Sequence, residues 1–430
     1  MTGRHWYAPD PRLPHRDVVL DETALARHLA GVLPLPGNPV ASVRRVRAKY
    51  LPGTSLRVVC SVRAADDVRL VAGRMFPGDI SNLQAASALA ATVPAGPLRP
   101  VTLDHALATI WWAFTNDRRI PGLAALDPPA PELAASLTGR WRRSRVVSLT
   151  PEKAALAACL DRRGEVIAYA KAYADGRGER VAAIHDALRA AAPAGIRVPS
   201  VLGSVAARGT LLLEPMPGRP LAELSERALP GALRALGHAL ARLHEAAAAA
   251  SARALPPARH LEPERIAEAA AVIGSAFPPL AEAAAALCGE LAGTRPPRGG
   301  PEAWLHGDLH LGNVLVADDG EIALIDLDRS ACGPAAADLG GILARLRYRW
   351  RLGGLSADGE AALRDALLGG YRAAGALPDE LELRWHTAAS LLAVRLVSAV
   401  TGVRAESFRH LDRLIADGAE LVAGAPVASV

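Results

Sequence analysis

Three polar residues in the last third of the sequence have the types and spacing that could bind a metal ion and activate a hydroxyl group. Asp308 lies in a His-Gly-Asp-Leu-His run, and Asn313 comes five residues after it. Two short apolar runs, 314–316 and 322–325, then flank an Asp-Asp-Gly turn, and Asp326 ends the second run. This pattern predicts a β-hairpin that brings Asn313, at its entrance, and Asp326, at its exit, to the same side.

Oxygen ligands on one side of a hairpin predict a site for a hard cation. The Asn313 amide and the Asp326 carboxylate are ligands of the kind that Mg²⁺ accepts. Asp308, on the loop just ahead of the hairpin, can then face an acceptor hydroxyl, orient it and receive its proton. Phosphoryl transfer needs such a carboxylate and metal site, and also a cation for the nucleotide phosphates and a connector for the adenine base.

The scarcity of lysine draws attention to one candidate for the phosphate-binding cation. Lysine occurs only as Lys49, Lys153 and Lys171, whereas arginine supplies the remaining basic charge. Lys171 ends the apolar run 166–170, which reads as a strand. An ammonium on a rigid strand is a compact point charge suited to nucleotide phosphates.

A possible adenine connector follows further along the chain. The run Leu-Leu-Leu-Glu-Pro-Met-Pro-Gly that starts at Leu211 predicts a strand leading into a segment bounded by proline and glycine. Backbone groups near Glu214 and Met216 are then free to bond the edge of an adenine. With this connector, all four parts occur in the chain order that ATP-dependent phosphoryl transfer requires.

The elements that must position these residues fall into three zones. The first, at about 20–135, opens with a helix at 22–31 capped by Asp21 and continues with strands at 55–62 and 68–74. The second begins near Trp141, and its predicted helix is 180–191 and its predicted strands are 145–149, 154–160, 166–172 and 211–215. The third, from about 219, is mostly helical apart from a short strand pair after His306.

The first two zones carry similar hairpin patterns. Leu56–Cys60 resembles Ala155–Cys159, and the next strand aligns Arg74 with Lys171. We interpret this as a duplicated hairpin unit, although amphipathic hairpins also resemble one another because all strands share a period of two. If the duplication is real, the first copy has lost whatever Lys171 does.

These residues resemble the motifs of aminoglycoside phosphotransferase-type small-molecule kinases, a family with the protein-kinase-like fold. The runs at 306–313 and 325–328 are the most specific part of a similarity that covers about 145–345, and accessory motifs end at His244 and begin at Asp338. The resemblance implies the following roles: Asp308 as catalytic base, Asn313 and Asp326 as Mg²⁺ ligands, and Lys171 as the phosphate-binding lysine.

The same resemblance implies an α+β, bilobal protein-kinase-like fold. We expect a small antiparallel-sheet N-lobe at 139–216 and a mainly helical C-lobe at 217–430. An extra N-terminal cap at 1–138 is similar to the cap of actinobacterial maltokinases and glucosamine kinases, and it could be a degenerate copy of the N-lobe hairpins.

The chain also departs from the kinase pattern near the nucleotide phosphates. It lacks a G-x-G-x-x-G motif, and the equivalent turn reads Thr-Pro-Glu-Lys and ends at Lys153, which we expect to help hold the nucleotide. For the glutamate that should pair with Lys171, Glu179 is the candidate and Asp186 the alternative. The short segment between Asp326 and Asp338 leaves little room for a regulated peptide-binding loop, which favours a small-molecule acceptor over a protein.

Composition limits the other classes of function. The net charge is +5, but the two arginine-rich runs, 44–47 and 140–145, lie just before predicted strands. They are interpreted as solvated faces or linker charge, so no nucleic-acid partner is expected. No run of the sequence predicts a membrane span. Four scattered cysteines without a C-x-x-C spacing fit the reducing cytoplasm. The oligomeric state stays open between monomer and homodimer.

The acceptor is the least determined part of the prediction. A basic chain suits a polycationic aminoglycoside poorly, so a sugar, an amino sugar or a sugar-containing natural product such as an antibiotic is favoured. Asp379, Glu380 and Glu382, near Trp385, could line an acidic pocket, but a solvated helix face is the simpler interpretation. The competing hypothesis is a nucleotide-binding pseudokinase or regulatory module without turnover.

Overall fold

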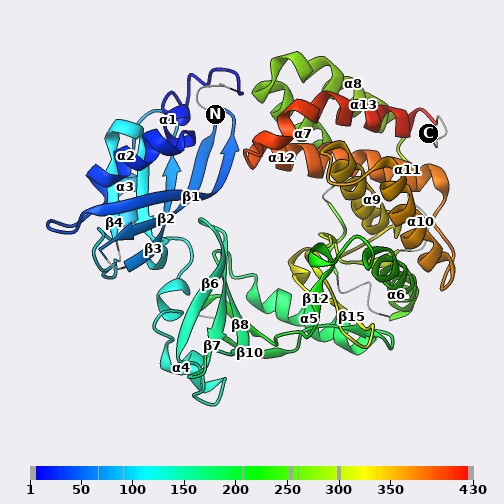
Figure 1. The fold of residues 1–430 in the computed structure, drawn as a ribbon, viewed down its shortest axis with the longest axis horizontal. Coiled ribbons are helices and arrows are strands. Elements are labelled where there is room, and N and C mark those ends of the chain that lie inside the picture. Colours follow the sequence, from blue (N-terminus) through cyan, green and yellow to red (C-terminus); the bar gives the residue numbers. More distant parts are fainter. Residues whose placement is uncertain are drawn as a thin grey trace. The chain divides into compact units, whose positions relative to one another are not determined.

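The computed structural model describes residues 6–65, 67–90, 92–205, 208–250, 255–259, 261–297 and 302–424. These residues form two compact units (Figure 1). The N-terminal unit contains the described residues up to Ala182 together with Val201–Pro215 and Thr401–Val403. The C-terminal unit contains Ala183–Ser200, Met216–Val400 and the described residues from Arg404 onward. The predicted boundaries at 138 and 216 stay predictions.

The first sheet of the N-terminal unit has five antiparallel strands in the order β1-β2-β3-β5-β4. The strands are β1 (Val40–Leu51), β2 (Ser55–Ala64), β3 (Asp67–Met75), β4 (Val101–Asp104) and β5 (Thr109–Ala113). The accompanying helices are α1 (Arg16–Leu20), α2 (Glu22–Val32) and α3 (Asn82–Leu89), whereas α4 (Pro131–Ala135) contacts the second sheet. Asp21 caps α2 as predicted, because its side chain accepts a hydrogen bond from the Ala24 amide at 2.7 Å.

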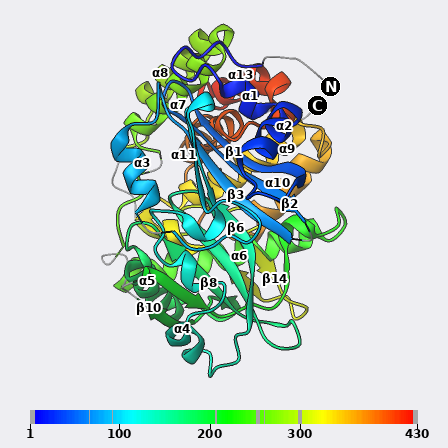
Figure 2. The ribbon, with the colours of Figure 1, turned by 90° about the vertical axis from the view of Figure 1, so that its left-hand side faces the viewer.

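The second sheet has five strands in the order β10-β11-β8-β7-β6 (Figures 1 and 2). The strands are β6 (Arg143–Thr150), β7 (Ala154–Leu160), β8 (Val166–Tyr173), β10 (Val201–Val205) and β11 (Thr210–Leu213), and helix α5 spans Gly178–Ala191. In each sheet three consecutive strands pair in order, a helix follows, and two later strands complete the sheet from the third. This shared topology is what a duplication would leave, and the duplication itself stays a prediction.

The register of the two sheets agrees as well as their strand order. Arg74 in β3 lies opposite Arg57 and Ile110, and Lys171 in β8 lies opposite Leu156 and Leu211. The alignment of Arg74 with Lys171 therefore describes equivalent positions in two sheets of the same topology. The two sheets also share one hydrophobic core, to which Trp112, Ala157, Ala170 and Leu212 belong.

The interpretation of the run 44–47 was wrong in one respect. Its arginines do not precede a strand but lie within β1, the edge strand of the first sheet. The alternation of arginine with valine escaped recognition because charged side chains replace the usual apolar residues on an exposed edge, where they also oppose strand-to-strand association.

The C-terminal unit is mainly helical. Its α-helices are α6 (Leu229–Ala250), α7 (Pro263–Ala276), α8 (Ala281–Gly293), α9 (Ala336–Arg351), α10 (Ala357–Arg372), α11 (Glu380–Ser390), α12 (Val397–Thr401) and α13 (Leu411–Val422), and a π-helical turn η9 spans Leu391–Leu396. Gly340 permits the contact between α9 and α11, because a Cβ there would lie 2.8 Å from the His386 carbonyl carbon. None of the described helices is both long enough and apolar enough to cross a membrane.

Short strands supply the framework of the loop that contains Asp308. The strands are β9 (Ile196–Arg197), β12 (Arg219–Pro220), β13 (Ala303–Leu305), β14 (Val314–Val316), β15 (Ile322–Leu324) and β16 (Ala331–Gly333). They form a sheet of order β12-β14-β15-β9 and the pair β13-β16. The α+β class is thus confirmed, with antiparallel sheets in the N-terminal unit and helices dominating the C-terminal one.

Candidate functional site

The hairpin predicted after Asp308 is present and brings the two candidate metal ligands to one end. Strands β14 and β15 pair antiparallel, with Val314 opposite Leu324. The ladder extends one step further, because the Ile325 amide donates to the Asn313 carbonyl at 3.0 Å. Asp326 follows at once, in the left-handed region at φ +62°, so the chain turns sharply as it leaves the hairpin.

The Asn313 side chain is held in place by the loop that contains Asp308. It is buried, and its Nδ2 donates to the carbonyl of Asp308 at 3.1 Å. This bond leaves the amide oxygen of Asn313 as the atom available to a cation. Asp326 is exposed and directly follows Ile325, the residue that is bonded to Asn313 across the hairpin. An amide oxygen and a carboxylate suit Mg²⁺, which commonly takes its remaining ligands from water and phosphate.

Gly307 is required where the loop approaches the segment after β15. Its φ is +74°, and a Cβ would lie 2.0 Å from the carbonyl oxygen of Arg329. A larger residue would both strain the backbone and push the two segments apart. The glycine therefore sets the distance between Asp308 and the helical turn η8 (Leu327–Arg329).

A buried carboxylate fixes the backbone of the same loop. Asp338, in the first turn of α9, accepts hydrogen bonds from the amides of His306 at 2.7 Å and Gly307 at 3.1 Å. Burial alone would raise the pKa of Asp338, but nearby His244 and the His306 amide lower it overall. His244 Nε2 is 3.6 Å from the carboxylate, and its Nδ1 is 3.0 Å from the Tyr371 hydroxyl. The loop is thus anchored by a buried polar chain running from α6 to α9 and α10.

A hollow beside Asp308 is rich in arginine. Asp308, whose side chain is 30% exposed, lines it together with Arg329 and Arg395, and Arg329 Nε lies 3.7 Å from Asp308 Oδ2. Arg395 comes from the π-helical turn η9, an irregularity often found at functional sites. Arg345 of α9 has a buried Nε without a hydrogen-bond partner among the described residues.

The electrostatics of this hollow are positive. Burial and neighbouring Arg345 lower the pKa of Arg395, and burial and Arg404 lower that of Arg345, whereas Asp308 raises both. The guanidinium groups nevertheless stay charged at neutral pH. Nothing in the spacing of Arg345 and Arg395 singles them out in the sequence, because helix packing brings α9 and η9 to Asp308.

The candidate nucleotide residues lie in and next to the second sheet. Lys171 lies in β8, with its Nζ 5.6 Å from the centroid of the Tyr173 ring. Glu179 is exposed in the first turn of α5, and Asp186 is exposed further along the same helix. The pairing of Glu179 with Lys171 stays a prediction. Lys153 closes the β6–β7 turn, donating its amide to the Thr150 carbonyl at 3.0 Å.

The predicted adenine connector follows β11 directly. Glu214 and Met216 are half-buried just beyond the end of this strand at Leu213. The division between the two units falls between Pro215 and Met216. Contact of this segment with a base stays a prediction.

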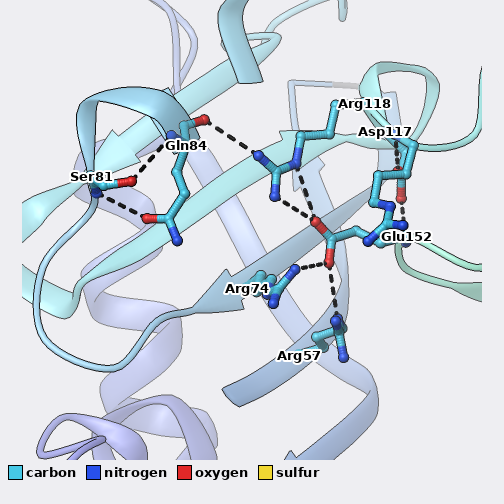
Figure 3. Close-up of polar contacts among 8 residues, drawn as sticks. Arg57, Arg74, Ser81, Gln84, Asp117, Arg118 and Glu152 are labelled. Atoms are coloured by element: carbon cyan, nitrogen blue, oxygen red, sulfur yellow. Dashed lines mark hydrogen bonds and ion pairs between the residues drawn. The ribbon is translucent and has the colours of Figure 1, made fainter. Parts of the chain in front are cut away.

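In the β6–β7 turn, the carboxylate of Glu152 forms ion pairs with three arginines (Figure 3). Glu152 Oε2 accepts from Arg57 Nε at 3.1 Å and from Arg74 Nη1 at 2.5 Å. Its Oε1 accepts from Arg118 Nε at 3.2 Å and Nη2 at 2.9 Å. Only 1% of the Glu152 side chain is exposed. Sequence reasoning missed this role, since the three arginines are distant in sequence.

A separate cavity of about 650 Å³ lies in the C-terminal unit. Asp379, Glu382 and Trp385 line it, so a purely solvated face was too simple an interpretation for these residues, although Glu380 is not part of the lining. His244 also lines this cavity, whereas Asp308 does not. The cavity and the hollow at Asp308 share Ala337.

Comparison with known families decides the class. Residues 168–386 match the model of the phosphotransferase enzyme family, which is half of the chain. The chain belongs to this family. The matched region includes Lys171, Asp308, Asn313 and Asp326 of the phosphotransferase, whereas the first sheet and the β6–β7 turn precede it.

Solved structures similar to this phosphotransferase include several small-molecule kinases. One is an aminoglycoside phosphotransferase from Streptomyces rimosus, with 22% identity, TM-score 0.43, and coverage of 60% of this chain and 93% of that one. Another is a macrolide 2'-phosphotransferase from Brachybacterium faecium, with 21% identity, TM-score 0.44, and coverage of 69% and 97%. A third is an amicoumacin kinase in complex with AMP-PNP and Ca²⁺, with 17% identity, TM-score 0.47, and coverage of 70% and 95%. No curated protein sequence matches the chain.

Proposed function

We propose that this phosphotransferase moves the γ-phosphoryl group of ATP to a hydroxyl of a sugar, an amino sugar or a sugar-containing natural product. The observation that carries the proposal is the arrangement around Asp308. Its loop is fixed by the buried Asp338, its carboxylate is partly exposed in a hollow, and Asn313 is bonded to its carbonyl. A carboxylate on a rigid loop can orient a hydroxyl with little loss of entropy at the moment of reaction.

Asp308 acts as the general base. Its carboxylate accepts the proton of the acceptor hydroxyl while the acceptor oxygen bonds to the γ-phosphorus and the bond from that phosphorus to ADP breaks. Asn313 and Asp326 would hold Mg²⁺, which would neutralise charge on the phosphate oxygens. Lys171 fixes the nucleotide phosphates, and Lys153, which closes the β6–β7 turn, helps to hold the nucleotide. Backbone groups near Glu214 and Met216 bind the adenine.

The arginines beside Asp308 bear on the acceptor class. A hollow containing Arg329 and Arg395, with Arg345 nearby, repels an acceptor that presents several amines at its reacting end. The same guanidinium groups hydrogen-bond sugar hydroxyls and attract carboxylate or phosphate substituents. A neutral or acidic sugar ring next to the reacting hydroxyl is therefore favoured over a polycationic one.

A coupled ADP-release assay tests this proposal. The panel compares glucose with glucuronate, and it compares maltose and glucosamine with streptomycin. Each acceptor is assayed separately at several concentrations with MgATP. We expect acceptor-dependent ADP release from a sugar of the panel, and a higher KM for that acceptor in Arg395→Leu. Preference for streptomycin, with no loss in Arg395→Leu, would contradict the acceptor class. Absence of any phosphoryl transfer would favour either an acceptor outside the panel or a pseudokinase.

A further inference from the structure

Equivalent positions of the two sheets hold cations with different partners. Arg74 occupies in the first sheet the place that Lys171 occupies in the second, as the register of both neighbouring strands shows. At the position opposite, the first sheet has Arg57 where the second has Leu156. Two guanidinium groups side by side repel each other unless an anion lies between them.

The anion that lies there is part of the protein. Glu152 reaches from the β6–β7 turn of the second sheet to Arg57 and Arg74 of the first, and Arg118 completes the cluster with two hydrogen bonds (Figure 3). The side chains of the three arginines are only 15–21% exposed. Burial alone would raise the pKa of Glu152, but Arg74, Arg118 and Arg57 lower it overall. Glu152 is therefore a charged, fully paired tie between the two sheets.

The tie also fixes the backbone of the turn. Glu152 has φ +59°, in the left-handed region that usually requires glycine. Its amide donates to Asp117 Oδ2 at 2.7 Å, and the other oxygen of Asp117 accepts from the Arg119 amide at 3.0 Å. This region is unfavourable for a non-glycine residue, which persists there only where its surroundings over-determine it. Here both the side chain and the amide of Glu152 are held by the segment at 117–119 and by the first sheet.

We propose that Glu152 is a positioning residue, through which the first sheet holds the β6–β7 turn in the conformation that covers the nucleotide phosphates. This inference rests on the proposed ATP-dependent function. A glycine-rich loop must lose conformational freedom when it closes over phosphates, and that loss weakens nucleotide binding. In this chain the turn is ordered before the nucleotide arrives, because the arginines of the first sheet hold it.

Binding of the nonhydrolysable nucleotide AMP-PNP with Mg²⁺ tests the proposal without knowledge of the acceptor. Calorimetry compares the wild type with Glu152→Gln, which keeps the size of the side chain and removes its charge. We expect the dissociation constant of Mg–AMP-PNP to rise about tenfold, because the nucleotide would then have to order the turn itself. Amide exchange of residues 150–154 should also accelerate, a local effect that a general loss of stability does not produce.

The matched control is Asp104→Asn, which neutralises another buried carboxylate of the N-terminal unit. Asp104 pairs with His28 at 2.6 Å and accepts from Trp111 Nε1 at 3.0 Å, away from the turn. This control should lower the melting temperature but leave the dissociation constant within about twofold of wild type.

If Glu152→Gln does not fold, Arg57→Gln removes a single 3.1 Å contact and should weaken nucleotide binding about threefold.

Two outcomes have distinct meanings. Folded Glu152→Gln with wild-type affinity and unchanged exchange at 150–154 would overturn the positioning role and leave the proposed function intact. Failure of the wild type to bind Mg–AMP-PNP would overturn the proposed function, and the positioning role with it.

Discussion

The first and second sheets of the N-terminal unit have the same strand order and register, yet they use equivalent cations differently. In the second sheet the position holds Lys171, the candidate for the nucleotide phosphates. In the first sheet it holds Arg74, which binds the carboxylate of Glu152. In the first sheet, the anion beside this cation is therefore Glu152 of the protein itself. We infer that the first sheet acts as a support rather than as a nucleotide site.

The difference follows from a small number of side chains. The residue opposite Lys171 is the apolar Leu156, whereas Arg74 faces Arg57 and lies near Arg118, so that three guanidinium groups converge. A planar guanidinium pairs geometrically with a carboxylate, and a flexible ammonium serves better as a point charge for phosphates. The choice of cation in each sheet therefore matches the anion that we assign to it.

Replacing Lys171 or Arg74 with alanine should give the largest difference between the two sheets, measured as loss of ATP turnover. Lys171→Ala should lower ATP turnover about 100-fold, since it removes a preorganised charge from the nucleotide phosphates. Arg74→Ala should reduce turnover less than tenfold, because it acts only through the turn. Steady-state ADP release at saturating and limiting ATP measures both, and equal losses in the two variants would break the distinction between the sheets.

Truncation of the tie should produce the largest loss of stability in the N-terminal unit. Glu152→Ala leaves three buried or half-buried guanidinium groups facing one another, which costs about 3–5 kcal/mol for a broken buried ion pair. The free energy of unfolding from urea titration measures the loss. A change below about 0.5 kcal/mol, the size of a typical surface substitution, would show that the tie is not needed.

The pH dependence of stability should report the same carboxylate. The pKa of Glu152 in the folded protein lies below its ordinary value of 4.5, so the folded state binds fewer protons than the unfolded state near that pH. Its contribution is therefore complete above pH 4.5 and is lost as the pH falls from there through the lower, folded pKa. The stability difference between wild type and Glu152→Gln should shrink across this range, whereas a constant difference would contradict the assignment.

The smallest expected effect comes from making the first sheet more like the second. Arg57→Leu copies Leu156 at the equivalent position and removes one of the contacts to Glu152, so about 1 kcal/mol should be lost. Thermal melts compared with Arg63→Leu, an exposed arginine of the same strand, measure this change. Equal melting temperatures for the two variants would mean that Arg74 and Arg118 suffice.

The sequence predicted those parts of the molecule in which neighbours in the chain are neighbours in space. The hairpin carrying Asn313 and Asp326 and the strand containing Lys171 depend on local period and turn residues, and they are present. The accessory motif that begins at Asp338 was recognised for the same reason, since its residues are neighbours in the chain. The cap on α2 likewise depends on one adjacent residue, Asp21.

The remaining features depend on packing that local patterns do not encode. Arg395 and Arg345 reach Asp308 only because α9 and η9 pack beside the loop. Glu152 lies about a hundred residues from Arg57 in sequence, and its positive φ contradicts the glycine rule on which turn prediction relies. The edge strand β1 was hidden by its arginines, whose charge resembles that of a loop.

The central claim is that Asp308 is the base that accepts the proton of the acceptor hydroxyl. Acceptor-dependent ADP release and Mg–AMP-PNP binding should be measured side by side for wild type, Asp308→Asn and the control Asp318→Asn, whose residue lies in the exposed hairpin turn. We predict that Asp308→Asn loses at least about 100-fold in turnover while nucleotide affinity is retained, and that Asp318→Asn matches wild type. Undiminished turnover in Asp308→Asn would contradict the account.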